Sequence, residues 1–75
     1  MTVNKSHLDE LDRLLQESLA AVETELSEQD RSDVREYLDH GEYGVAYELL
    51  AFVLDKQQVV HPAALIEASR KMGMG

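Results

Sequence analysis

Hydrophobic residues recur at intervals of three and four along almost the whole chain, and no stretch of strand length alternates between hydrophobic and polar residues. This spacing places apolar side chains on one face of an α-helix and differs from the two-residue period of a half-buried strand. We therefore predict an all-α protein, a compact bundle of four short helices in a single helical domain covering residues 1–75. The helices are expected at residues 6–25, 28–40, 42–57 and 62–72.

The first two predicted helices each have a polar start and one apolar face. Ser6 stands three residues before Asp9, in the spacing of a capping box, and Ser27 precedes a second acidic first turn. Gly41 suits the left-handed residue that ends a helix, so it should separate the second helix from the third. The expected apolar faces are Leu8, Leu11, Leu14, Leu15, Leu19, Val22 and Leu26 in the first helix, and Val34, Tyr37 and Leu38 in the second.

The third predicted helix differs from the others because residues 43–54, YGVAYELLAFVL, are apolar almost all round. A helix of this kind is typically covered by neighbours on most sides, so we expect it to be the central helix. The fourth helix should have Pro62 at its first position, where the missing amide hydrogen costs nothing, and should end before Gly73. Its expected inward-facing residues are Leu65, Ile66, Ser69 and Met72.

Composition narrows the possible partners of the chain. Its 75 residues contain no cysteine, which excludes disulfides and thiolate metal sites. Fifteen acidic residues against seven basic ones give a formal charge of -8, which disfavours direct binding to nucleic acid or to an anionic membrane surface. The most apolar window, residues 45–54, has about half of the ~20 residues that a membrane-spanning helix needs, and the first ten residues lack the apolar run of a secretory signal. We expect a cytoplasmic protein.

No motif points to catalysis or to a cofactor. The three histidines fall near the ends of three different predicted helices, without the spacing of metal ligands. No serine or threonine lies in a glycine-bracketed turn beside a base, as a catalytic nucleophile would. The acidic residues of the second helix lie along a solvated edge and not in the dry pocket that raises the pKa of a catalytic carboxylic acid. We predict that the protein is not an enzyme, with no catalytic residue, no metal site and no cofactor.

The negative charge is concentrated in the middle of the chain. Residues 23–48 carry nine acidic and two basic residues and all three tyrosines, whereas the flanking segments are close to neutral. Carboxylates accelerate encounter with a basic partner, and tyrosine supplies contact area at low entropic cost. A solvated acidic helix face and core tyrosines are the competing interpretation. The predicted partner-binding residues are Asp33, Glu36, Tyr37, Asp39, Glu42, Tyr43 and Glu48.

Residues 34–50 read VREYLDHGEYGVAYELL, and this segment resembles the MafI-type immunity proteins of bacterial polymorphic toxin systems, which act in contact-dependent inhibition. The similar features are a short helix, the G-E-Y-G turn at residues 41–44, and an apolar helix with an acidic–leucine pair. The resemblance extends over residues 26–72 and implies a protein that binds and neutralises a toxin domain, in many cases a nuclease. Glu42 and Tyr43 are the site residues that match the turn.

Three functions follow as hypotheses. The first is an immunity protein that binds a basic toxin domain, such as a nuclease, without catalysis. The alternative is a small acidic regulatory or adaptor module that binds a basic segment of another protein. A remote alternative is an acyl carrier-like protein, because Glu17-Ser18-Leu19 is similar to the DSL motif of acidic four-helix carriers; however, Ser18 lies inside the first predicted helix and not at the start of the second. The sequence does not determine the oligomeric state.

Overall fold

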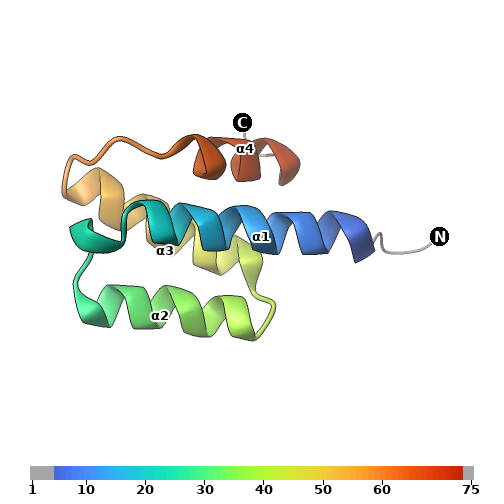
Figure 1. Ribbon diagram of the computed structural model, residues 1–75, viewed down its shortest axis with the longest axis horizontal. Coiled ribbons are helices and arrows are strands. Elements are labelled where there is room, and N and C mark those ends of the chain that lie inside the picture. Colours follow the sequence, from blue (N-terminus) through green and yellow to red (C-terminus); the bar gives the residue numbers. More distant parts are fainter. Residues whose placement is uncertain (1–4, 74–75) are drawn as a thin grey trace.

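The computed structural model describes residues 5–73, and its helices confirm the predicted all-α bundle (Figure 1). Within this range the chain contains four α-helices and one 3-10 turn, and no strand. The turn, η1, joins the first helix to the second. The elements in chain order are α1 (Lys5–Ala21), η1 (Glu23–Glu25), α2 (Glu28–Asp39), α3 (Tyr43–Lys56) and α4 (Ala63–Lys71).

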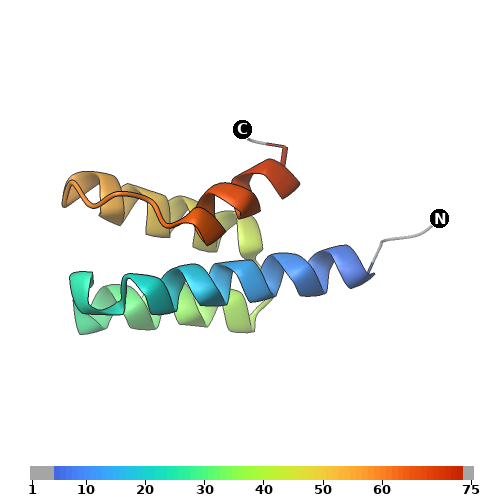
Figure 2. The same cartoon turned by 45° about the horizontal axis from the view of Figure 1, so that its top comes forward.

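The four helices form two layers. In Figure 1 α1 crosses the middle of the molecule, with α2 on one side of it, α4 on the other and α3 behind. The turned view of Figure 2 separates a layer of α3 and α4 from a layer of α1 and α2. The most closely packed pairs are α1 with α4 and α2 with α3. None of the described helices combines the length and the apolar character needed to cross a membrane.

One hydrophobic core holds the helices together, and each of the four contributes to it. Burial of apolar surface contributes roughly 25 cal/mol per Å², so this core is the main stabilising element of a small domain. Its members are Leu11, Leu14, Leu15, Leu19, Val22, Leu26, Val34, Leu38, Ala46, Leu50, Val53, Leu54, Leu65 and Ala68.

Two residues predicted to face the core are exposed. Leu8 is 37% exposed because the N-terminal end of α1 extends past the neighbouring helices (Figure 1). Ile66 is 48% exposed. The buried residues Leu65 and Ala68 mark the side of α4 that packs on the core, and Ile66 is turned away from that side.

The first helix ends four residues earlier than predicted. After Ala21 the backbone tightens, so that the amide of Glu25 donates to the carbonyl of Val22 at 2.8 Å and the amide of Leu26 donates to that of Glu23 at 3.4 Å. These bonds close the smaller rings of a 3-10 turn. The turn keeps both Val22 and Leu26 buried while the chain reverses towards α2, which is why the apolar spacing suggested a longer helix.

Of the predicted helix starts, only that of α2 has the expected capping residue. The Ser27 hydroxyl accepts a hydrogen bond from the amide of Asp30 at 3.1 Å. Ser6 lies within α1, which already includes Lys5, so it is not the cap. Pro62 is the N-cap of α4, with extended backbone at ψ 156°, and is not the first helical residue.

Helices α2 and α3 end in the same backbone motif. Gly41 has φ +73°, and the amide of Glu42 donates to the carbonyl of Tyr37 at 2.9 Å. Gln58 has φ +59°, and the amide of Val59 donates to the carbonyl of Leu54 at 2.8 Å. Both are Schellman motifs, in which a left-handed residue allows the last carbonyls of a helix to find donors. Gly41 therefore ends α2 as predicted.

The expectation that α3 is covered on most sides was wrong. Its buried residues, Ala46, Leu50, Val53 and Leu54, occupy one side only. Val45 is 44% exposed and Phe52 is 62% exposed, because the other three helices all pack on the opposite side of α3. The helix therefore presents an apolar surface that the fold leaves open.

Candidate functional site

Two adjoining hollows lie along α2 and α3. One has a volume of about 300 Å³ and the other of about 460 Å³, and Tyr37 lines both, so they form one continuous surface that we call the α2–α3 face. The smaller hollow is also lined by Asp33, Glu36, His40 and Glu42, and the larger by Val45, Glu48, Leu49 and Phe52.

The acidic part of the face follows from helical spacing in α2. Asp33, Glu36, Tyr37 and His40 are separated by three and four residues, so they lie along one edge of the helix. Val34, next to this edge, is buried in the core, and its burial sets the rotation of α2 about its axis. The acidic residues thereby come to lie beside α3, where the turn at Gly41 adds Glu42 to the same hollow.

The apolar part of the face follows from spacing in α3. Val45, Leu49 and Phe52 stand at positions i, i+4 and i+7, one helical stripe beside the buried stripe that contains Leu50. The helix thus carries two apolar stripes, one packed into the core and one exposed. This arrangement explains why the sequence of α3 is apolar almost all round.

Charge on the face has one predominant sign. Four carboxylates line the two hollows, and none of the described residues that line them is a lysine or an arginine. Lys56, at the end of α3, places its Nζ 6.0 Å from the centre of the Phe52 ring. Long-range attraction would therefore be towards a positively charged partner.

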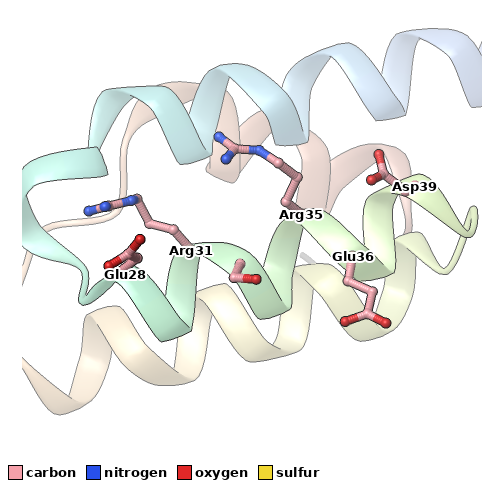
Figure 3. A pocket seen from close by; sticks show the side chains of 6 residues that line it. Glu28, Arg31, Arg35, Glu36 and Asp39 are labelled. Atoms are coloured by element: carbon pink, nitrogen blue, oxygen red, sulfur yellow. The ribbon is translucent and has the colours of Figure 1, made fainter.

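The two arginines of α2 lie on the other edge of the helix. Figure 3 shows Arg31 and Arg35 directed towards α1, whereas Glu36 points the opposite way. Arg31 has a structural role: its Nη1 donates hydrogen bonds of 3.0 Å to the carbonyls of Glu23 and Leu26, which join α1 to α2. Both positive charges of α2 thus lie away from the α2–α3 face, on an edge where Glu28 and Asp39 accompany them.

Local hydrogen bonds hold two of the polar groups on the face. Gln29 Nε2 donates to Asp33 Oδ1 at 2.8 Å, and His40 Nδ1 donates to the carbonyl of Glu36 at 2.8 Å. Glu36, Glu42 and Glu48 are exposed, so their side chains can reach a partner.

Five of the seven residues predicted to bind a partner lie on the α2–α3 face: Asp33, Glu36, Tyr37, Glu42 and Glu48. Asp39 lies on the edge of α2 that carries the arginines (Figure 3). Tyr43 is half-buried against the core, and partial burial together with the nearby carboxylates of Asp12 and Asp9 in α1 raises the pKa of its hydroxyl above 10.0. The structure thus places Tyr43 towards α1 and not with Tyr37.

Sequence reasoning missed the apolar residues of the face, Val45, Leu49 and Phe52, because the third predicted helix was expected to be covered by neighbours on most sides. The signal that could have found them is their i, i+4, i+7 spacing, which forms a second apolar stripe next to the stripe that contains Leu50. A helix that packs on one side buries only one of two such stripes. These residues change the character of the site from acidic to both acidic and apolar.

Metal binding and the acyl carrier-like alternative can be compared with the described residues. No three His, Asp or Glu side chains among them are grouped so that they could hold a metal ion. Ser18 is fully buried, and its hydroxyl donates to the carbonyl of Leu14 at 2.7 Å. A prosthetic group on Ser18 would have to displace the core, which argues against an acyl carrier-like function.

Comparison with known protein families, with curated proteins and with solved structures finds no match to this chain.

Proposed function

We propose that this chain is an immunity protein that binds and neutralises a basic toxin domain through its α2–α3 face, without catalysis. The observation that supports the proposal is the composition of the face, where Phe52, Tyr37 and their apolar neighbours adjoin four carboxylates. Aromatic contact area with a charged rim is the composition of many protein interfaces. The resemblance of residues 34–50 to MafI-type immunity proteins supports a toxin as the partner.

The mechanism requires complementarity and no chemistry. A nuclease presents lysine and arginine to a phosphate backbone, so an acidic protein can occupy the same surface by presenting negative charge in its place. The carboxylates would accelerate encounter over about a Debye length, and the apolar groups would slow dissociation. Inhibition would then be stoichiometric.

An adaptor that binds a basic segment of a regulatory protein is the second candidate, because the same face would serve it. Genetic context distinguishes the two. An immunity gene is expected directly beside a toxin gene, since a cell that makes the toxin needs the inhibitor at once, whereas an adaptor gene has no such requirement.

The test is a growth-protection experiment with the product of the adjacent upstream reading frame. That product is expressed from an inducible promoter, alone or with this chain, and growth is measured. We expect growth arrest that wild-type protein relieves and that a variant with Glu36→Lys, Glu42→Lys and Glu48→Lys does not relieve.

The matched control reverses Glu17, Glu23 and Glu25, which are exposed on α1 and η1 and change the net charge equally. The control variant should still protect. Absence of a toxic product beside the gene, or equal protection by both variants, would contradict the proposal.

A further inference from the structure

The exposed stripe of α3 is more apolar than a solvated helix face requires. Val45 is 44% exposed, Phe52 is 62% exposed, and Leu49 lies half-buried between them in the larger hollow. The other exposed large hydrophobic residues, Leu8, Val60 and Ile66, lie on other segments. A contiguous exposed apolar patch beside polar groups is typical of an interaction surface.

We propose that this hollow binds an amphipathic helix of the partner. Apolar side chains of that helix, spaced at i, i+3 or i+4, and i+7, would contact Val45, Leu49 and Phe52, and its lysine or arginine side chains would lie against Glu36 and Glu48. The inference rests on the proposed function in that the same face binds the partner, and it adds the form of the segment that is recognised.

Geometry favours a helix as the occupant. The stripe covers seven residue steps, which at ~1.5 Å per residue is roughly 10 Å, or two helical turns. The side chains of two packed helices leave a groove that a third helix can fill by ridge-into-groove packing. A peptide that binds by β-strand addition would need a sheet edge to pair with, and residues 5–73 form no strand.

Charge disfavours a second copy of this chain as the occupant. In a two-fold symmetric dimer the same patch faces itself, so the carboxylates of Asp33, Glu36, Glu42 and Glu48 in one copy would meet those of the other. Like charges brought together in this way disfavour association, and the whole chain carries a formal charge of -8. A basic amphipathic helix satisfies both the apolar stripe and the acidic rim.

The test uses three synthetic peptides of about 18 residues, a length at which a helix can form on binding. The first has leucines spaced at three and four with lysines elsewhere, the second keeps the leucine spacing with glutamates in place of lysines, and the third has the composition of the first in an order that is not amphipathic. Each is titrated into isotopically labelled protein, and amide chemical shifts are followed.

We expect the first peptide to shift the amides of Tyr37 and of residues 45–52 most strongly. The glutamate peptide and the scrambled peptide should bind at least roughly tenfold more weakly. Equal binding of the glutamate peptide would overturn the role of charge, and equal binding of the scrambled peptide would overturn the role of the stripe.

A pair of variants tests the location. Phe52→Ser should weaken binding of the first peptide roughly tenfold, because an exposed aromatic side chain that anchors a partner carries much of the binding energy. Ile66→Ser removes an exposed apolar residue of similar exposure from α4 and should leave binding unchanged. Circular dichroism and thermal melting check that both variants are folded.

Two further results would overturn the inference. One is that shifts are spread over α1 and α4 and do not depend on Phe52. The other is that the protein alone shows concentration-dependent shifts at residues 45–52, which would identify a second copy as the occupant. Because no toxin is used, failure here is distinguishable from failure of growth protection, which tests the proposed function.

Discussion

Gln58 and Gly41 occupy the same position in two helix ends, and their different side chains make a natural comparison. Both have positive φ in a Schellman motif. A left-handed backbone conformation brings a Cβ atom close to the following carbonyl oxygen, which glycine avoids. No atom lies within 4 Å of where a Cβ on Gly41 would be, so backbone conformation and not crowding decides the preference there.

We predict that Gln58→Gly stabilises the protein by about 0.5–1 kcal/mol and that Gly41→Ala destabilises it by about 1 kcal/mol. The free energy of unfolding from urea titration checks both values. Gln57→Gly, one residue earlier with φ -94°, is the control for glycine itself and should not stabilise. A gain from Gln57→Gly equal to that from Gln58→Gly would contradict the explanation.

A second prediction at the residue scale concerns Arg31, whose side chain donates hydrogen bonds to two backbone carbonyls of the turn between α1 and α2. Arg31→Met keeps much of the apolar stem but removes both guanidinium hydrogen bonds, and the Glu23 carbonyl then keeps only the amide of Leu26 as a donor. We therefore expect a loss of about 1–2 kcal/mol in urea unfolding. Arg35→Met is the control, since Arg35 makes no side-chain hydrogen bond or ion pair with the described residues. Equal losses in the two variants would show that charge and not the hydrogen bonds matters.

The raised pKa of the Tyr43 hydroxyl gives a pH dependence with a definite sign. The folded state keeps the proton to a higher pH than the unfolded state does, so unfolding is favoured as pH rises above the ordinary value of 10.0. We predict that raising the pH from neutral to above 10.0 lowers the stability of the Tyr43→Phe variant less than it lowers the stability of the wild type. Thermal melting of both proteins over this range measures the difference, and parallel curves would contradict the prediction.

At the scale of single elements, the sequence of α3 predicts where the helix begins and ends but not which of its sides is buried. Its boundaries follow from local signals, and they lie within one residue of those predicted from the sequence. The spacing of its apolar residues also defines two stripes. Which stripe is buried depends on the helices that pack against it, and these are not encoded in the segment itself.

A matched pair of substitutions separates the two stripes. Leu50 is fully buried, so Leu50→Ala should cost about 2–5 kcal/mol through lost burial and a cavity. Phe52 is 62% exposed, so Phe52→Ala should cost less than about 1 kcal/mol although it removes a larger side chain. Urea unfolding measures both, and similar costs would mean that Phe52 belongs to the core.

At the scale of the whole molecule, the sequence places the acidic residues in one segment, and the fold decides which surface they occupy. The acidic residues of residues 23–48 could have surrounded α2 evenly. Instead Asp33 and Glu36 line the hollow of the α2–α3 face, whereas Arg31 and Arg35 are directed towards α1, on an edge that also carries Glu28 and Asp39 (Figure 3). Packing of α2 between α1 and α3 produces this separation.

The separation predicts how association with a basic partner depends on salt. Reversal of Glu36, Glu42 and Glu48 should lower the association rate of the proposed toxin complex at least roughly tenfold at low ionic strength, and the difference should shrink as salt screens the field. Reversal of Glu17, Glu23 and Glu25 changes net charge equally and should lower the rate less. Stopped-flow or surface-based kinetics over a salt series measures this, and equal effects would mean that net charge alone governs encounter.

The sequence by itself determined the four helices, the cap at Ser27, the stop at Gly41 and the concentration of acidic residues in the middle of the chain. These features depend on neighbours within a few residues, since helical hydrogen bonds and caps are local. Only the tertiary structure decided that Tyr43 turns towards α1, that the stripe of Phe52 is exposed, and that the acidic edge of α2 lies beside it. Burial depends on which surfaces distant segments cover, and a helix with two apolar stripes can pack on either one until its neighbours are in place.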